Sequence, residues 1–178
     1  MSRSIIIGTV IVGVLGTFAL AAGQNISHGS HDAGSSASPA HRRMHAALEE
    51  RKGVIAQGLG AGLAFPADQN DYPGPLHVLE LKDVLRLTAQ QERRVEALQT
   101  AMFAASRPAS TRLLEAEARL RRLFADGRAD EPGVRAAVAD TERAWTDVRL
   151  VHLLAHLQAR AVLTDEQRRL YREARWGQ

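Results

Sequence analysis

The sequence predicts an all-α protein, a bent antiparallel hairpin of about four helices that follows an export signal and a flexible linker. Alanine, leucine and arginine dominate its second half, and only 4% of the 178 residues are aromatic, which suits slender helices packed through small side chains. Apolar residues recur at helical spacing over long stretches. No segment alternates apolar and polar residues for long enough to form a strand.

The N-terminus, residues 1–21, has the pattern of a secretory signal peptide. Arg3 precedes an apolar run that ends at Phe18, and small residues follow, so we expect cleavage after Ala21. The alternative is an uncleaved membrane anchor, although the run is at the short limit of a span of about 20 apolar residues. Either case predicts export, and in a bacterium with two membranes it predicts a periplasmic protein.

Residues 22–42 are predicted to form a flexible linker, because Ser, Gly and Ala cannot bury enough apolar surface to fold. Histidines at positions 28, 31 and 41 leave open a second interpretation, a loose metal-collecting tail. The helical domain is expected over residues 43–176.

The first expected helix runs from Met44 to about Gln57 and has Gly53 as its weak point. The next segment, 58–75, is rich in Gly, Asn, Asp and Pro and is predicted to be an irregular connection that ends in the turn "YPGP". A second helix is expected over 76–86.

The long helices follow. Residues 88–126 carry one apolar stripe, and Pro108 is expected to kink or split this block. Gly127 is a suitable C-terminal cap. A further helix is expected from Asp130 to about Val162, and a last one over roughly 165–176.

The same junction signal occurs twice, as "LTAQQ" and "LTDEQ". A threonine followed three residues later by glutamine is a capping box, in which the hydroxyl accepts from the backbone and the glutamine returns to the cap amide. The motif residues are Leu87, Thr88, Gln91, Leu163, Thr164 and Gln167.

With these two motifs, in an exported helical chain without cysteine, residues 72–176 resemble the LTxxQ superfamily of periplasmic proteins. That family includes the Spy and CpxP envelope-stress proteins and related zinc-resistance and cobalt–nickel sensor proteins. The resemblance implies a bent four-helix hairpin that is usually dimeric. It also implies one of two roles, chaperoning of unfolded envelope proteins without ATP or binding of divalent transition metals, with a membrane signalling protein as a further possible partner.

The candidate metal ligands begin with His152 and His156, four residues apart on one helix face, where two imidazoles can hold one ion. The opposite face carries four leucines, Leu150, Leu153, Leu154 and Leu157. The histidine face also carries apolar residues, and a helix that is apolar on both sides is usually buried on both sides. We therefore expect the histidines to meet another helix or a second subunit.

A second pair, His41 and His45 with Glu49, lies on the first helix and would join the first pair if the helix folds back. Such ligands suit Zn, Cu, Ni or Co. His77, three residues before Glu80, is a further candidate. The alternative for all of these histidines is an ordinary packing or hydrogen-bonding role.

Other function classes find no support. The chain has no cysteine, and its net charge of +3 comes from interleaved acids and bases, which argues against nucleic acid as a partner. We find no catalytic motif and no organic cofactor motif, so we expect no enzyme. Arginines that could line a client-binding face are Arg93, Arg94, Arg119, Arg121 and Arg122.

Overall fold

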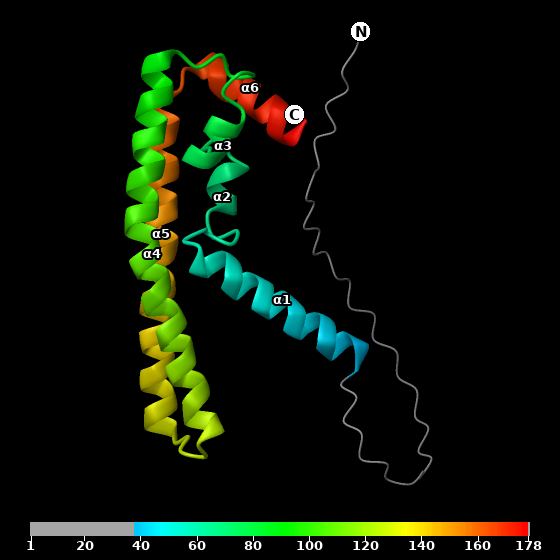
Figure 1. Cartoon of the computed structure of the whole chain (residues 1–178), viewed down its shortest axis with the longest axis vertical. Coiled ribbons are helices and arrows are strands. Elements are labelled where there is room, and N and C mark those ends of the chain that lie inside the picture. The colour runs from blue at the N-terminus through cyan, green and yellow to red at the C-terminus, as the bar shows by residue number, and fades with distance from the viewer. Residues whose placement is uncertain (1–37, 178) are drawn as a thin grey trace. The chain divides into compact units, whose positions relative to one another are not determined.

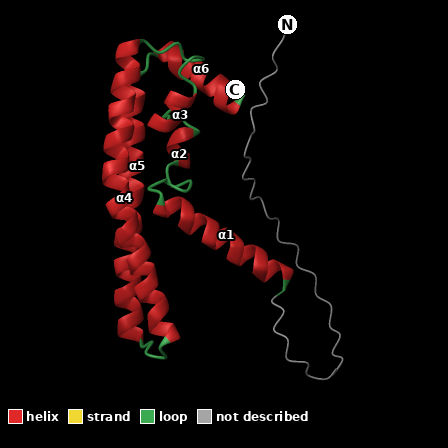
Figure 2. Cartoon of the chain, in the orientation of Figure 1, coloured by secondary structure: helices red, strands yellow, loops and turns green. Residues whose placement is uncertain are grey.

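The structure is a computed structural model that describes residues 38–177, and over this range it is all-helical, as predicted (Figures 1 and 2). Six helices and no strand occur among these residues, against the expected four or so. None of the helices in this range combines the length and hydropathy that a membrane crossing needs. The expected signal peptide and most of the expected linker lie outside the described residues.

The longest elements are α4 (Ala89–Ala125) and α5 (Glu131–Val162), which form the predicted antiparallel hairpin (Figure 1). Asp130 caps the start of α5, where its Oδ1 accepts from the backbone N–H of Gly133 at 2.8 Å. Gly127 follows the end of α4 with a φ of +65°, a left-handed conformation that favours glycine. The last helix, α6 (Asp165–Trp176), has the predicted bounds.

Pro108 does not split α4, which corrects one of the two expectations for this residue. A proline removes the backbone hydrogen bond to the residue four positions earlier, here the carbonyl of Ala104. Both residues are exposed, so water can solvate that carbonyl. On the opposite side, Ala109 and Leu113 are fully buried and hold the helix in place.

The first helix, α1 (Pro39–Ala56), starts five residues before the predicted Met44 and therefore includes the end of the expected linker. Ser38 caps it by accepting from the backbone of His41 at 3.2 Å, and proline suits the first helical position. Ile55 is the only residue of α1 that is fully buried, so the helix is anchored mainly at its C-terminal end.

Two short helices follow. α2 (Phe65–Asp68) lies inside the connection that was predicted to be irregular. α3 (Pro75–Glu80) ends six residues before the predicted end, because residues 81–86 form turns that reverse the chain into α4. Arg86 takes a positive φ of 51° in this reversal.

The buried side chains form two apolar clusters with polar residues between them along the hairpin. The middle cluster consists of Ile55, Leu63, Ala109, Leu113, Ala116, Ala144 and Val148. The junction cluster consists of Val78, Leu85, Val95, Ala159, Leu163 and Tyr171. The stretches of α4 and α5 between the two clusters bury Ser106, His152 and His156.

Candidate functional site

The two LTxxQ motifs meet at one end of the hairpin, where their glutamines bond to each other. Gln91 Nε2 donates to Gln167 Oε1 at 2.8 Å, and Gln167 Nε2 donates to Gln91 Oε1 at 3.0 Å. Gln91 Nε2 also donates to the carbonyl of Val162 at 3.0 Å. Both capping boxes are complete, with the backbone N–H groups of Thr88 and Thr164 each donating to its glutamine at 3.0 Å.

The predicted capping boxes are therefore confirmed, but their contact with each other was not predicted. Leu163 is buried in the junction cluster and Leu87 packs against it. The motif residues tie the start of α4 to the start of α6, so their role in this fold is structural.

His152 and His156 lie on the buried face of α5, with 4% and 7% of their surfaces exposed. They contact α4 and the 57–75 segment, which confirms that the histidine face meets another part of the protein. The expectation that both faces of this helix are buried is wrong. Leu150, Leu154 and Leu157 remain about half exposed, because the close contact with α4 is made by the face with smaller side chains.

His152 belongs to a hydrogen-bonded chain that joins three elements. The Ser106 hydroxyl donates to the carbonyl of Gly58 at 2.6 Å, so the hydroxyl oxygen accepts from His152 Nε2 at 3.1 Å. The other side of the ring lies against Gly60, where an added Cβ would be 3.0 Å from His152 Cγ. Burial lowers the pKa of His152, and the nearby charge of His156 lowers it further.

His156 has a different partner. Its Nδ1 lies 2.6 Å from the carbonyl oxygen of Tyr72, so Nδ1 carries the proton and Nε2 carries the lone pair. Nε2 faces Gly74, where an added Cβ would be 2.8 Å away. Burial lowers the pKa of His156, and the hydrogen bond to Tyr72 opposes that change only in part.

The histidine pair on α1 is not joined to the pair on α5. His41 and His45 are exposed, with ring centroids 6.5 Å apart, whereas the α5 histidines are buried. Glu49 pairs with Lys52 at 2.5 Å. Within residues 38–177, no group of three or more histidine, aspartate or glutamate side chains is close enough to hold a metal ion.

His77 belongs to a polar cluster around the buried carboxylate of Asp68. Asp68 Oδ1 accepts from the Tyr171 hydroxyl, and Oδ2 lies 3.6 Å from His77 Nδ1 and 3.6 Å from Arg175 Nε. Trp176 Nε1 donates to the Asp68 carbonyl at 3.3 Å. We call Asp68, His77, Tyr171 and Arg175 the Asp68 cluster; it fixes α6 to α2 and α3.

The charge of Asp68 is held by its neighbours. Burial alone raises the pKa of this carboxyl, but the contacts from His77 and Tyr171 outweigh burial and leave the pKa below its usual value. Burial and the contact with Asp68 raise the pKa of Tyr171 well above its usual range. Asp68 is therefore a buried carboxylate beside a neutral phenol.

The tautomer of His77 follows from its two contacts. Arg175 can only donate, so its contact with His77 Nε2 at 3.2 Å makes Nε2 the acceptor. Nδ1 then carries the proton and faces Asp68. Nδ1 is buried and has no hydrogen-bond partner within the usual distance among the described residues.

The sequence analysis missed Asp68, Tyr171 and Arg175. Tyr171 offered one signal, because it lies on the apolar face of α6 and a buried tyrosine hydroxyl usually needs a partner. Asp68 had no comparable signal, since it stands in a stretch without helical periodicity.

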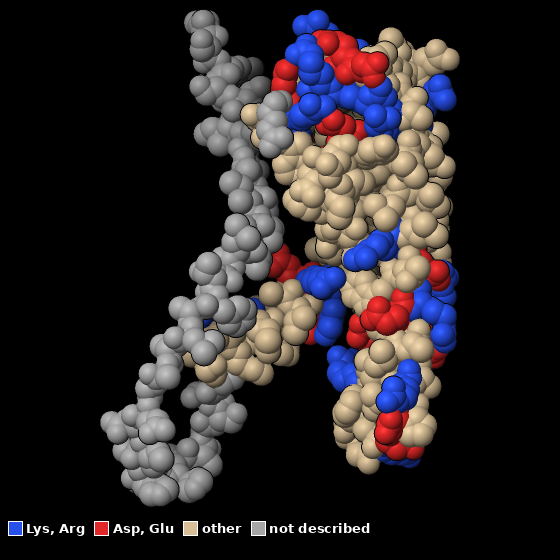
Figure 3. Space-filling view, turned by 180° about the vertical axis from the view of Figure 1, so that it is seen from behind, with Lys and Arg blue, Asp and Glu red and all other residues tan. Residues whose placement is uncertain are grey.

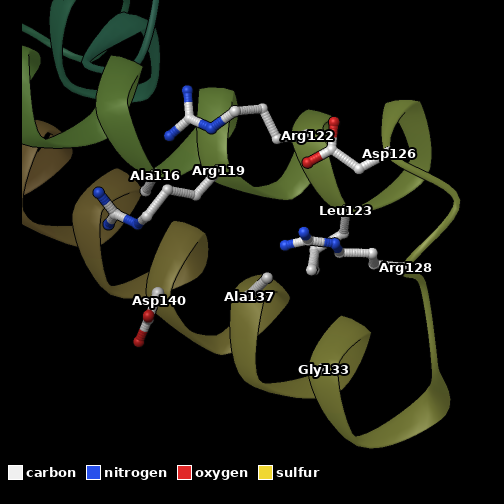
Figure 4. A pocket seen from close by; sticks show the side chains of 9 residues that line it. All are labelled: Ala116, Arg119, Arg122, Leu123, Asp126, Arg128, Gly133, Ala137 and Asp140. Carbon is white, nitrogen blue, oxygen red and sulfur yellow. The ribbon is translucent and has the colours of Figure 1, made fainter.

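A separate hollow of about 370 Å³ lies between α4 and α5 where the chain turns from one to the other (Figure 4). Arg119, Arg122 and Arg128 line it together with Asp126 and Asp140. Two of the arginines were expected on a client-binding face. The acidic side chains on the same walls offset their charge, and no histidine lines this hollow.

Comparison of the chain with protein-family models, with curated proteins and with solved structures found no match in any of the three.

Proposed function

We propose that this chain is an exported metal-response protein that binds a divalent transition metal ion, Zn, Cu, Ni or Co, through His77 and His156. The observation that carries the proposal is the orientation of the two imidazoles. Each faces an oxygen with its Nδ1, the Tyr72 carbonyl for His156 and the Asp68 carboxylate for His77. Histidines that ligate metals generally have such a partner, which leaves Nε2 as the ligand atom. Nε2 of His156 lies against Gly74, so metal binding at this atom requires the backbone at Gly74 to move away.

Arg175 is the competitor of the metal ion in this proposal. Its guanidinium contacts Nε2 of His77, the atom that would ligate, and also faces Asp68. A metal ion bound to Nε2 of His77 would take the place of the Arg175 guanidinium, so binding at His77 releases Arg175. Because Arg175 lies at the end of α6, metal binding would loosen that end of the helix and give the protein a metal-dependent change of surface.

The other predicted ligands have other roles in this proposal. His152 is a positioning residue that holds the 57–60 segment through Ser106. His41 and His45, with Glu49, offer an exposed alternative site on α1. The two sites can be separated because they share no residue.

The test is calorimetric titration of the full chain with Zn, Cu, Ni and Co ions. We expect micromolar or tighter binding of at least one ion to the wild-type chain. His77→Ala and His156→Ala should each weaken it at least tenfold, a change of about 1.4 kcal/mol. The double variant His41→Ala/His45→Ala is the matched control and should bind like wild type.

Absence of binding to all four ions would reject the metal role. Loss of binding in the α1 variant alone would place the site on α1. Far-UV circular dichroism of each variant distinguishes the loss of a ligand from the loss of the fold.

Export is part of the proposal and rests on the pattern of residues 1–21. Intact mass of the protein recovered from a bacterial periplasm tests it. A mature chain that begins at Ala22 supports cleavage, and an unprocessed chain in the membrane fraction supports the anchor.

A second candidate function, chaperoning of unfolded proteins, is favoured by a hollow of about 500 Å³ beside α1 and α5. Leu63, Phe65 and Leu153 are apolar residues of its wall, and Arg51 and Arg149 also line it. Phe65 is half exposed. Apolar walls with basic side chains suit an unfolded chain that carries both apolar and acidic residues.

This candidate is tested by the aggregation of a denatured client in the absence of metal. Suppression by the wild-type chain that is lost in Phe65→Ser would support it. Val84→Ser is the matched control, because Val84 is equally exposed but lies outside the hollow. No suppression at an equimolar amount would reject it.

A further inference from the structure

A hollow of about 630 Å³ beside Trp145 is lined by residues of α1, α4 and α5. Glu117 of α4 lines it together with Glu142 and Arg149 of α5, and Arg51 lines it from α1. We call it the Trp145 hollow. Figure 3 shows charged side chains of both signs where α1 meets the hairpin. The volume of the hollow is in the range of pockets that hold small molecules.

The ring of Trp145 already has a cation on its face. The ring is half-buried and packs against the middle cluster, and its Nε1 donates to Glu117 Oε1 at 2.9 Å, which fixes its orientation. The guanidinium carbon of Arg51 lies over the ring, 4.7 Å from the centroid. A cation at this distance is attracted by the negative face of the indole. The contact shows that this site accepts a guanidinium group.

The charges on the walls favour a cation in this position. Among residues 38–177, neither Glu117 nor Glu142 forms an ion pair. Arg51 and Arg149 balance these two carboxylates, so removal of Arg51 leaves one negative charge uncompensated. Arg149 lies seven residues after Glu142, about 10 Å further along α5. Glu142 lies three residues before Trp145 and is therefore its neighbour on the helix surface.

Arg51 belongs to a helix with few other attachments. Residues 38–51 are all exposed, and Ile55 is the only fully buried residue of α1. Figure 1 shows α1 extending away from the hairpin beyond its C-terminal end. Arg51 can therefore leave the Trp145 ring while Ile55 keeps its place in the middle cluster.

We propose that the Trp145 hollow binds a small organic cation with a guanidinium or alkylammonium group, and that Arg51 is its internal competitor. The charged group of the ligand replaces the Arg51 guanidinium on the Trp145 ring, beside Glu142. Leu63 supplies an apolar wall for the rest of the ligand. Binding releases α1 from the ring. The site shares no residue with the proposed metal site, so it holds whether or not the chain binds metal.

The fluorescence of Trp145 tests the proposal in the full chain. The sequence contains two tryptophans, so Trp176→Phe leaves Trp145 as the only one. In this background we expect butylguanidinium to change the fluorescence in a saturable manner, with a millimolar dissociation constant. Butylurea has a similar shape without the charge and should cause no such change. Calorimetric titration of the chain with both tryptophans gives the affinities independently of this background.

Removal of the competitor is the decisive comparison. Arg51→Ala should strengthen the binding of butylguanidinium about five- to thirtyfold, because it removes the cation–π contact that competes with the ligand. Arg43→Ala is the matched control and should leave the affinity unchanged, since Arg43 is an exposed arginine of α1 that does not line the hollow. Glu142→Gln should weaken binding about threefold, the effect of an exposed ion pair.

Hydrogen exchange of α1 measures the displacement of Arg51. Butylguanidinium should speed the exchange of residues 39–52 in the wild-type chain. Arg51→Ala should speed it without ligand. Glu142 lines this hollow but not the neighbouring one of about 500 Å³, so Glu142→Gln should leave the suppression of client aggregation unchanged.

Absence of saturable binding to Arg51→Ala would overturn the proposal, because no internal cation then competes for the ring. If Arg51→Ala speeds the exchange of α1 without raising the affinity for butylguanidinium, Arg51 only attaches α1 to the hairpin and the proposal is rejected. Equal binding of butylurea would also reject it, because the hollow would then not select for charge.

Discussion

Replacement of Gln91 and Gln167 by alanine, singly and together, tests the structural role of the two LTxxQ motifs. Apart from a longer contact of 3.3 Å with the Thr88 hydroxyl, the Gln91 side chain takes part in four hydrogen bonds, to the Thr88 backbone, to Val162 and two to Gln167. Gln167 takes part in three, one to Thr164 and the same two to Gln91. The two motifs are therefore expected to be coupled in stability.

The magnitudes follow from the shared bonds. A net value of about 0.7 kcal/mol for each bond, within the usual range, predicts losses of about 3 kcal/mol for Gln91→Ala and about 2 kcal/mol for Gln167→Ala. The double variant should lose about 3.5 kcal/mol, because the two bonds between the glutamines are lost only once. The coupling energy is then about 1.4 kcal/mol.

Urea unfolding followed by circular dichroism measures these free energies of unfolding. The single variants Thr88→Ala and Gln91→Ala in one motif, compared with their double variant, provide a reference for coupling within a capping box. If the losses of Gln91→Ala and Gln167→Ala add to within about 0.4 kcal/mol, the glutamines do not act as a pair and the reasoning fails.

Three further predictions concern the histidines and the Asp68 cluster. Because the pKa of His152 is lowered in the folded chain, the unfolded chain binds more protons in acid. The contribution of His152 to the free energy of unfolding should be complete above about pH 6.5 and should be lost as the pH falls below that value. In urea unfolding at several pH values, His152→Gln should make this fall shallower. Gly74→Ala should lower the free energy of unfolding by about 1–3 kcal/mol, because the added Cβ crowds His156. Gly53→Ala should raise it by about 0.5–1 kcal/mol, because no atom lies near the added Cβ. Equal shifts of the melting temperature in the two variants would contradict this prediction. Tyr171→Phe should cost about 1.5–3 kcal/mol in urea unfolding, because it removes a donor from a buried carboxylate; an unchanged midpoint would show that the bond contributes little.

Local signals in the sequence were sufficient for the helix boundaries that depend on neighbouring residues. Thr88, Asp130 and Thr164 cap helices through residues three positions away, and each of these caps is found in the structure. The reciprocal bonds of Gln91 and Gln167 join residues 76 positions apart. Their contact depends on the register of the hairpin, which no local pattern contains.

Helical periodicity identified the two faces of α5 but did not decide which face is buried. The face with the leucines is the more hydrophobic of the two. The other face is buried instead, because Ala155 and Ala159 allow a closer approach to α4. The expectation that Pro108 could split the helix failed because its outcome also depends on which side of the helix is exposed. Its exposed position lets water replace the missing hydrogen bond, which the sequence alone does not reveal.

The candidate site was only partly accessible to sequence reasoning. His77 and His156 were among the predicted ligands, but His156 was paired with His152, and His77 was a separate candidate beside Glu80. In the fold, His77 of α3 faces Asp68 at the end of α2, and His156 of α5 contacts Tyr72 in the segment between α2 and α3. Short helices without periodicity, such as α2, are the elements that sequence patterns place least well.

X-ray absorption at the zinc edge of the zinc-loaded full chain tests the proposed site most directly, because it counts the imidazoles that ligate the ion. We expect two imidazoles for each zinc ion in the wild-type chain, one in His156→Ala, and two in His41→Ala/His45→Ala. An imidazole count that is unchanged in His156→Ala, or that falls only in the α1 variant, would contradict the proposal that His77 and His156 hold the metal.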